Sequence, residues 1–299
     1  MIRPVRFQAN PETAASNRFQ ARSPLRGAVS ERAQTEFDRV VDVLRAADVR
    51  VHVFDDTPEP AKPDAVFPNN WVSFHADGSL AVYPMMARSR RAERRLEVLS
   101  ELVATGGFQV TRFVDLTHHE LEHRYLEGTG SLVLDRMHRV AYACLSARTD
   151  AAVATEFSRL FGYELVMFEA VDSSGGTVYH TNVLMALGTK FAIVCLESIL
   201  GPQRASVRDR LERSGRQVIA LSLAQMNAFA GNMIELGTGA GSLIVAMSQQ
   251  ACDVLDAAQR AELERLAGAI VAVPIPTIER AGGGSVRCMI AEVHLPRVS

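Results

Sequence analysis

The chain has 299 residues, of which 47% are hydrophobic, so it is long enough to fold around a substantial core. Its 32 Lys and Arg residues nearly balance 34 Asp and Glu residues, and the formal net charge of -2 excludes the basic field that sequence-independent nucleic-acid binding requires. No uncharged apolar run reaches the roughly 18 residues of a membrane span, and residues 1–26 lack the apolar stretch of a signal peptide. The composition therefore predicts a soluble, cytoplasmic protein that binds neither nucleic acid nor membrane.

Helix-like segments alternate with strand-like segments five times along the chain. In each unit, apolar residues at helical spacing precede a short β-rich run. The expected helix and strand pairs are 26–50 with 51–54, 89–105 with 108–113, 149–161 with 164–168, 203–214 with 218–221, and 257–267 with 270–273. Further short strands are expected at 71–74, 80–83, 131–134 and 191–195. The pattern predicts an α/β protein with an approximate internal repeat, organised as one domain over residues 1–299.

The sequence offers no motif for nucleotide binding, because it lacks both a GxGxxG after the first strand and a GxxxxGK[ST]. Its turn residues gather instead at four places where polar residues also cluster, and such turns bring backbone close to a ligand or to another turn. They are Pro68-Asn69-Asn70, Gly128-Thr129-Gly130, Ser174-Gly175-Gly176 and Gly282-Gly283-Gly284.

Four cysteines occur without a CxxC pair, which argues against a disulfide framework and a structural zinc site. Cys288 follows the three consecutive glycines and precedes apolar residues, so we expect an accessible thiol where a flexible loop meets a strand. Arg287 and backbone N–H groups beside it would favour the reactive thiolate. The other three cysteines lie in apolar segments with a strand-like or helical pattern, and each is expected to be a buried structural thiol. They are Cys144, Cys195 and Cys252.

A nucleophilic cysteine needs an acid or base, and eight histidines compete for this role. His180 follows a glycine turn and precedes an apolar run, the same local pattern as at Cys288. His118, His119 and His123 form a cluster in which the last two could share one helical face as metal ligands. No third ligand of matching context is evident, so the cluster is interpreted as a polar loop. The remaining histidines are expected to be structural: His52, His75, His138 and His294.

Three further positions carry groups suited to a polar site. Glu127 precedes a glycine turn and could orient an imidazole and hold it cationic. Arg148 could bind a carboxylate with two hydrogen bonds, or it could simply cap a helix. Asn69 and Asn70 offer neutral amides that both donate and accept hydrogen bonds, although an Asn-Asn turn also explains them.

These segments, in this order, resemble the guanidino-group-modifying enzymes, the pentein superfamily of arginine deiminases, dimethylarginine hydrolases and amidinotransferases. The resemblance covers residues 64–296 and has six parts. They are Phe-Pro-Asn-Asn-Trp at 67–71, Leu-Glu-Gly at 126–128, Leu-Ser-Ala-Arg-Thr at 145–149, Tyr-His-Thr-Asn at 179–182, Gly-Asn at 231–232, and the glycine-rich cysteine loop at 282–289. The resemblance implies a fold of five αβ units arranged with pseudo-fivefold symmetry as a propeller around a central site.

The resemblance also implies the roles of the site residues. Cys288 would form a covalent adduct, His180 would act as general acid and base, and Glu127 would hold His180 protonated. Arg148 would bind the substrate carboxylate, and four asparagines would position the reacting group or backbone atoms: Asn69, Asn70, Asn182 and Asn232. No metal and no cofactor are implied. The one partner expected is a small amino-acid substrate, with a homodimer as the commonest assembly of soluble enzymes.

The chain departs from arginine deiminases at two positions that matter for the substrate. Where those enzymes present Asp, this chain has Asn69 or Asn70 in the first loop and Asn182 two residues after the histidine. A guanidinium would lose two hydrogen bonds to a charged group, each contributing about 1.5–3 kcal/mol, whereas a neutral ureido group matches an amide. The segment at 67–71 also resembles the citrulline-utilisation hydrolases, so we expect hydrolysis of citrulline to ornithine, ammonia and carbon dioxide.

Two alternatives remain open. An arginine deiminase, dimethylarginine hydrolase or amidinotransferase would need a carboxylate for the guanidinium, and the spare candidates are Asp64, Asp172 and Glu235. A non-catalytic amino-acid-binding propeller would keep the pocket without the chemistry. The joint presence of Glu127, His180 and Cys288 argues against this last alternative, because a sensor has no use for a nucleophile.

Overall fold

The computed structural model describes residues 1–20 and 28–298. The α-helices are α1 (Val29–Ala46), α2 (Arg88–Arg91), α3 (Leu96–Gly106), α4 (Gly128–Ser131), α5 (Ala151–Phe161), α6 (Thr181–Leu184), α7 (Gln203–Arg213), α8 (Leu223–Asn227), α9 (Gln249–Val254), α10 (Ala257–Ala267) and α11 (Pro276–Gly282). The 3-10 helices are η1 (Pro68–Asn70), η2 (Thr117–Glu122), η3 (Leu196–Ser198) and η4 (Val286–Met289).

The strands form five small sheets. They are β1 (Ile2–Arg3), β2 (Phe54–Asp55), β3 (Val72–Phe74), β4 (Ser79–Val82), β5 (Arg112–Asp115), β6 (Leu132–Asp135), β7 (Val140–Cys144), β8 (Glu164–Phe168), β9 (Met185–Leu187), β10 (Phe191–Val194), β11 (Gln217–Ala220), β12 (Ile234–Gly237), β13 (Leu243–Ser248) and β14 (Ala269–Val273). Four sheets have three strands, in the orders β3-β4-β5, β6-β7-β8, β9-β10-β11 and β12-β13-β14, and the fifth pairs β1 with β2.

The three-stranded sheets share one topology. In each, the first two strands are antiparallel and the third returns parallel to the second. A parallel return needs a crossover, and a helical segment supplies it in every case. The two-stranded sheet keeps only this parallel step, with α1 as its crossover. The internal repeat predicted from the sequence thus corresponds to small sheets that recur with the same strand topology. The expected α/β class is confirmed.

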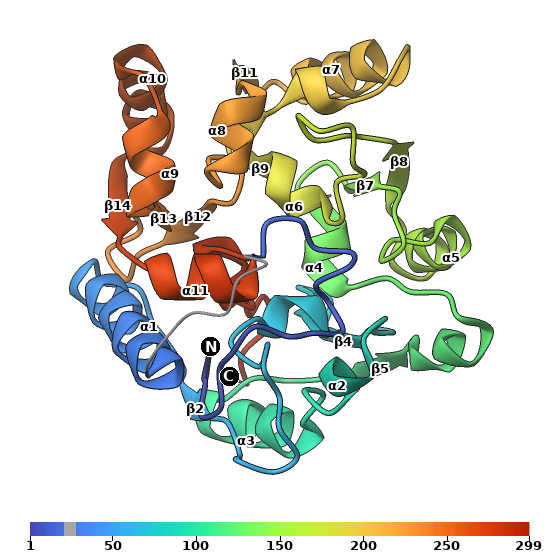
Figure 1. Ribbon diagram of the computed structural model, residues 1–299, viewed down its shortest axis with the longest axis vertical. Helices are drawn as coiled ribbons and strands as arrows, with labels where there is room; N and C mark the ends of the chain where they lie inside the picture. Colours follow the sequence, from blue (N-terminus) through green and yellow to red (C-terminus); the bar gives the residue numbers. More distant parts are fainter. Residues whose placement is uncertain (21–27, 299) are drawn as a thin grey trace.

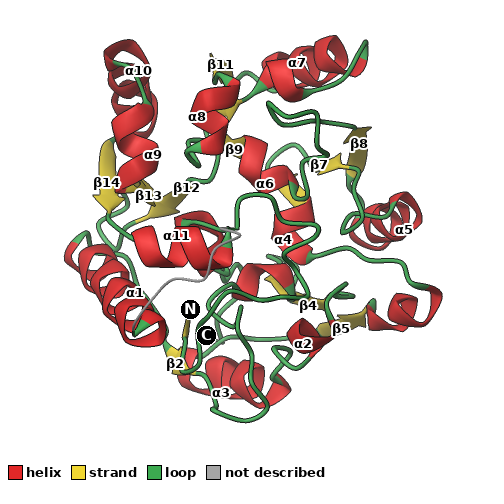
Figure 2. Cartoon of the chain, in the orientation of Figure 1, coloured by secondary structure: helices red, strands yellow, loops and turns green. Residues whose placement is uncertain are grey.

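The long helices lie at the periphery and the short ones near the centre (Figure 1). α1, α3, α5, α7 and α10 occupy the outside of the molecule, whereas α4, α6 and α11 lie further in. Figure 2 shows several strands, among them β7, β9, β12 and β13, between these two sets of helices. No helix of the described residues is long and apolar enough to cross a membrane.

Amphipathic helices fix the outer layer. α5 buries Val153, Ala154, Phe157 and Phe161 and leaves its other face to solvent. These side chains pack in one apolar cluster with Ala141 and Ala143 of β7. Asp150 begins the helix by accepting hydrogen bonds from the backbone N–H groups of Ala152 and Val153, and Gly162 ends it in the left-handed conformation.

The element boundaries differ from the sequence prediction mainly in the second unit. The helix expected at 89–105 is divided into α2 and α3, because Arg95 is extended and Arg90 turns into the interior. The strand expected at 108–113 begins only at Arg112. The helix expected at 26–50 is α1, and its first two expected residues, 26 and 27, lie outside the described residues.

Each three-stranded sheet is preceded by a short turn, and these turns bring the polar residues together. η1 precedes β3, α4 precedes β6, α6 precedes β9, and the turn holding Asn232 precedes β12. α4 packs against both η1 and α6, and η1 packs against η4, which carries Cys288. Segments separated by more than 200 residues therefore meet at one place.

Candidate active site

Glu127 and His180 are joined by a hydrogen bond at the centre of this cluster of turns. Glu127 immediately precedes α4 and His180 immediately precedes α6, and both side chains are almost fully buried. His180 Nε2 lies 2.9 Å from Glu127 Oε2. Because the carboxylate accepts this bond, Nε2 carries the proton and Nδ1 is left to act as a base.

The electrostatics of this pair differ from the expectation that Glu127 keeps His180 cationic. Burial lowers the pKa of His180 to about 4; the bond to Glu127 opposes this effect, while Arg148 and Arg90 add to it. Burial alone would raise the pKa of Glu127, but Arg148, His180 and Arg90 outweigh it and hold that pKa well below its usual range. The two guanidinium groups lie 3.5 and 3.6 Å from Glu127 Oε2. At neutral pH the pair is a carboxylate with a neutral imidazole.

Cys288 lies in η4, and two side-chain amides contact its sulfur. Asn182 Nδ2 and Asn232 Nδ2 each lie 3.3 Å from Sγ. Two N–H donors of this kind stabilise negative charge on the sulfur. The setting differs from the accessible loop predicted from the sequence, because Cys288 is only 2% exposed and belongs to a 3-10 helix. Arg287 is engaged elsewhere, with Glu292 and the carbonyl of Ile290.

The two adjacent asparagines of η1 have different positions. Asn70 lines a small cavity together with His180 and Cys288, whereas Asn69 is not among the lining residues. The side-chain oxygen of Asn70 accepts a hydrogen bond of 2.8 Å from Arg90, and its Nδ2 lies 3.1 Å from Asn69 Oδ1. The structure therefore places Asn70 toward the reacting groups and Asn69 behind it.

Two arginines and a carboxylate form the other side of the cavity. Arg148, Arg90 and Asp64 all line it and are buried. The cap of α5 is supplied by Asp150, so Arg148 is not a capping residue. Arg90 forms two hydrogen bonds with the buried carboxylate of Glu93, at 3.0 and 2.9 Å. Burial raises the pKa of Asp64, and the charge of Arg90 opposes this effect. Oδ1 of Asp64 has no hydrogen-bond partner in the structure.

An N-terminal segment, residues 10–20, closes this side of the site. Asn10 donates a 2.8 Å hydrogen bond to Asp64, and Asn17 donates to the carbonyls of Gly282 and Gly283. Arg148 donates to the carbonyl of Thr13 and to the hydroxyl of Ser16. The remaining cavity measures about 10 Å³, room for roughly one water molecule. This volume is too small for an amino acid.

Glycine is required where the turns approach one another. A Cβ on Gly130 would lie 2.4 Å from Asn70 Nδ2 and 2.7 Å from His180 Nδ1. Gly128 has φ of +48°, and a Cβ there would lie 2.3 Å from the carbonyl oxygen of Asn69. These contacts explain the Gly128-Thr129-Gly130 sequence after the glutamate: it lets Asn70 and His180 lie against the backbone of α4.

Sequence reasoning missed part of this site. Arg90 lies in a basic run, a pattern typical of a solvent-exposed helix. The burial of the Arg90 side chain depends on partners that are far away in the sequence. The part that residues 10–20 play in the site is indicated only weakly by the sequence, as a stretch rich in amide and hydroxyl side chains before the first helix. Asp64, a spare candidate, lines the cavity, whereas Asp172 and Glu235 do not. Ser174-Gly175-Gly176 also lies outside this lining, in an Asx-type turn on Asp172.

Cys144 and Cys195 are buried, as the sequence predicts, whereas Cys252 is only partly buried, which differs from the prediction. Burial raises the pKa of Cys144 to about 12, and it also raises the pKa of Cys195 and Cys252. Three larger cavities, of about 390, 380 and 250 Å³, contain none of Glu127, His180 or Cys288 in their walls.

The histidine cluster is arranged differently from the helical face considered for His119 and His123. η2 is a 3-10 helix that ends before His123, whose φ of +55° turns it toward the Tyr125 hydroxyl. His119 instead contacts Glu156 of α5.

The site combines a buried cysteine that contacts two amides with a neutral imidazole that is hydrogen-bonded to a carboxylate. Two arginines lie beside the closed cavity. These groups are the ones that covalent cysteine catalysis requires: a thiol, a base within the same cavity and donors that stabilise negative charge. The family comparison is more specific. The chain matches the N,N dimethylarginine dimethylhydrolase family, eukaryotic, over residues 3–295, and it belongs to that family.

Solved structures share the fold. The apo crystal structure of ArgZ, an arginine dihydrolase from the ornithine-ammonia cycle in cyanobacteria, is 15% identical with a TM-score of 0.75, and the match covers 100% of this chain and 40% of ArgZ. AgrE with L-arginine is 17% identical with a TM-score of 0.74, covering 98% of this chain and 40% of that one. DDAH from Pseudomonas aeruginosa with citrulline is 16% identical with a TM-score of 0.63, covering 96% and 95%. The chain thus spans two fifths of full-length ArgZ. No curated protein sequence matches the chain significantly.

These findings confirm the resemblance to the pentein superfamily. The cysteine-dependent amidine hydrolysis that this membership suggests is taken up below as a proposal.

Proposed function

We propose that the protein hydrolyses the ureido C–N bonds of citrulline, giving ornithine, ammonia and carbon dioxide through a covalent adduct on Cys288. The observation that carries this proposal is the neutral character of the reacting end of the site. Asn70 lines the cavity, and Asn182 and Asn232 contact the sulfur, where a guanidinium would call for carboxylates. Amides match the carbonyl and N–H groups of a ureide.

The opposite end of the cavity fits the amino-acid part of this substrate. Arg148 and Arg90 offer guanidinium groups for the α-carboxylate, and Asp64 offers a carboxylate for the α-ammonium group. Arg148 must first leave its contacts with Thr13 and Ser16. We infer that residues 10–20 release the arginine as substrate enters and then cover the bound molecule.

The first half of the reaction forms the adduct. Neutral His180 accepts the thiol proton, and the Cys288 thiolate adds to the ureido carbon while the amides stabilise the developing charge. The resulting imidazolium gives this proton to the departing nitrogen, and its C–N bond breaks to release an amine. A thiocarbamate on Cys288 remains. Glu127 stabilises the transient imidazolium through the bond to Nε2.

The second half returns the free enzyme. His180, neutral again, takes a proton from water, and the resulting hydroxide attacks the thiocarbamate carbon and expels the thiolate. The carbamate so formed takes up a proton and decomposes to the second amine and carbon dioxide. One water molecule and one citrulline thus give ornithine, ammonia and carbon dioxide, with no external oxidant or reductant.

A guanidino substrate is the second candidate, and Asp64 favours it. Among the described residues lining the cavity, Asp64 is the one carboxylate, and it could bind a guanidinium instead of an α-ammonium group. Family membership points the same way, since the family is described by dimethylarginine hydrolysis. The reaction would then release dimethylamine or ammonia from the guanidino carbon.

We also infer that the five sheets surround the site as the blades of a pseudo-fivefold propeller within one domain of residues 1–299. The shared topology of four sheets and the turns that precede their first strands support this arrangement.

Product analysis tests the proposed activity. The purified protein is incubated separately with L-citrulline, L-arginine and dimethylarginine, and ornithine, citrulline, ammonia and dimethylamine are quantified. We expect ornithine and ammonia in equal amounts from citrulline alone. Cys288→Ala serves as the blank and Cys252→Ala as the matched control, which should retain activity. Release of citrulline from arginine or dimethylarginine would overturn the substrate assignment, and turnover by Cys288→Ala would overturn the covalent mechanism.

A further inference from the structure

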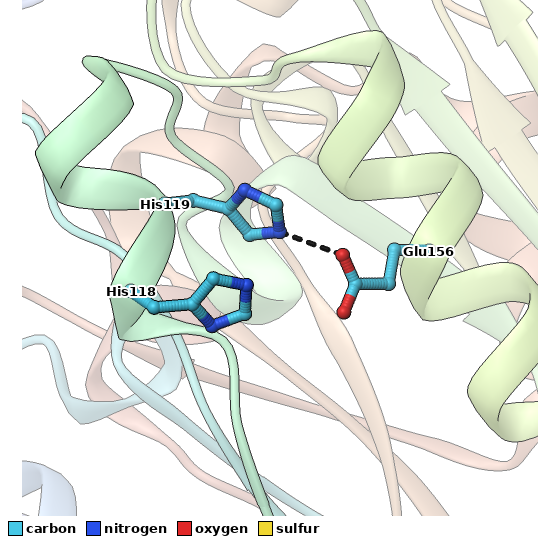
Figure 3. A group of neighbouring side chains, drawn as sticks. All are labelled: His118, His119 and Glu156. Atoms are coloured by element: carbon cyan, nitrogen blue, oxygen red, sulfur yellow. Dashed lines mark hydrogen bonds and ion pairs between the residues drawn. The ribbon is translucent and has the colours of Figure 1, made fainter.

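Outside the active site, two adjacent imidazoles face one carboxylate. His118 and His119 lie on η2, and Glu156 lies on α5 (Figure 3). One ligand atom from each residue can be chosen so that all three atoms lie within 4.8 Å of one another. The centroids of the two imidazole rings are 4.1 Å apart, and the ring planes are inclined by 35° to one another.

The ring nitrogens that face Glu156 are available as ligands. His119 Nε2 lies 2.7 Å from Glu156 Oε2. His118 directs its Nδ1 to the carbonyl oxygen of Asp115 at 3.3 Å, and its other ring nitrogen faces the Glu156 carboxylate in Figure 3. A backbone carbonyl on the far nitrogen is the contact that fixes the tautomer and orientation of a metal-bound histidine. Two imidazole nitrogens and a carboxylate oxygen are a donor set typical of Zn²⁺.

The burial of the three residues suits an ion with one open coordination position. His119 is buried, Glu156 is half-buried and His118 is exposed, so the cluster opens to solvent on the His118 side. Zn–N and Zn–O bonds of about 2.0–2.2 Å place tetrahedral ligands roughly 3.4 Å apart. The contact between His119 and Glu156 would lengthen slightly and His118 would rotate inward, which an exposed side chain can do without disturbing the core.

We propose that His118, His119 and Glu156 bind a Zn²⁺ ion, with water as the fourth ligand. The ion would link η2 to α5, two segments that lead into the active site. Glu127 follows η2 by five residues and Arg148 precedes α5 by three. The backbone between them is already paired, since Asp150 N donates to Tyr125 O at 2.7 Å and Leu126 forms a bridge with Thr149. Zinc would stabilise this pairing and so act as a structural ion for the Glu127 and Arg148 segments.

Equilibrium dialysis against Zn²⁺ tests the site in a Cys288→Ala background, where the active-site thiol cannot compete. We expect one Zn²⁺ per chain. His118→Ala and Glu156→Gln should weaken binding at least tenfold, since each removes or impairs a ligand. Both side chains are on the outer side of the cluster, so these variants should keep the fold; a circular dichroism spectrum checks this. His123→Ala is the matched control, a histidine of the same segment that contacts Tyr125 instead, and it should bind zinc unchanged.

A second measurement separates a zinc site from a plain His119–Glu156 ion pair. Zn²⁺ should raise the melting temperature of the Cys288→Ala protein, because an ion that binds only the folded state stabilises it. The same addition should have no such effect on His118→Ala, although that variant keeps the His119–Glu156 contact. Zinc binding that is equal in the parent, His118→Ala and Glu156→Gln, or no saturable binding below millimolar Zn²⁺, would overturn the proposal.

Discussion

Asn182 holds its side-chain nitrogen 3.3 Å from the sulfur of Cys288, and both residues are buried. Asn232 donates to the same sulfur and also, at 2.8 Å, to the backbone carbonyl of Asn182. The second contact fixes the backbone of Asn182 beside the nucleophile. The two asparagines thus contact the thiol itself, in addition to the backbone contact that the sequence analysis allowed for.

Loss of the Asn182 amide should slow reactions of the thiol. A hydrogen bond to a charged group contributes about 1.5–3 kcal/mol, so Asn182→Ala should reduce the rate of Cys288 alkylation by a haloamidine roughly 10- to 100-fold. Asn182→Asp should reduce it at least as much, because an anion would then face the sulfur. The measurement is the second-order labelling rate at fixed pH, with Asn227→Ala, an exposed asparagine, as control. Unchanged labelling in both Asn182 variants would contradict the role assigned to the amide.

A methyl group on Gly130 should disable the site without unfolding the protein. Gly130→Ala places a Cβ 2.4 Å from Asn70 Nδ2 and 2.7 Å from His180 Nδ1, so both groups must shift. A displacement of about 1 Å at a catalytic group costs on the order of 100-fold in rate. We expect kcat to fall by about this factor. Gly237→Ala, where the added Cβ meets no atom within 4 Å, is the matched control and should leave kcat unchanged.

The burial of His180 should make the protein less stable in mild acid. The pKa of His180 is lowered from its ordinary 6.5 to about 4, so between these values the unfolded chain binds a proton that the folded chain does not. The resulting stability is complete above about pH 6.5 and is lost as the pH falls toward 4, by at most about 3 kcal/mol. The lowered pKa of Glu127 continues this loss below pH 4.5.

Urea unfolding of the wild type and of His180→Gln, at pH values from 4 to 7, measures this contribution. Burial raises the pKa of Glu93 to about 8 and of Glu279 to about 7, and these groups gain stability as the pH falls. The quantity compared is therefore the difference in unfolding free energy between wild type and variant, which should shrink with acidity. A difference that is constant across this range would contradict the buried, neutral state of His180.

The sequence predicted the periodic parts of the fold closely. The helix expected at 257–267 is α10 and the strand expected at 164–168 is β8, with the same bounds. Both are short amphipathic or β-rich segments whose form depends on local spacing. The basic run near Arg90 was predicted wrongly, because its break depends on burial against Glu93, Asp64 and Asn70. No local pattern reports a guanidinium that turns inward to distant partners.

The site was predictable where its chemistry leaves a short motif. Glu127 precedes Gly128 and Gly130, and Cys288 follows Gly282, Gly283 and Gly284; these glycines permit close packing, and the pattern is visible in the sequence. The closure of the cavity by residues 10–20 was not predicted, since it consists of single hydrogen bonds from Asn10, Asn17 and Ser16 to groups elsewhere.

Asp64 provides the sharpest test of how the substrate lies in the cavity. If its carboxylate binds the α-ammonium group, Asp64→Asn should raise KM for citrulline about 10- to 100-fold, the effect of losing one hydrogen bond between charged groups. The same substitution should leave KM unchanged for 5-ureidopentanoate, which is citrulline without its amino group. Steady-state kinetics with both compounds measures this, and Asp55→Asn, at an exposed aspartate, is the control. If KM rises equally for the two compounds, Asp64 contacts the ureido end, and the guanidino substrate becomes the better assignment because a carboxylate would then face the reacting carbon.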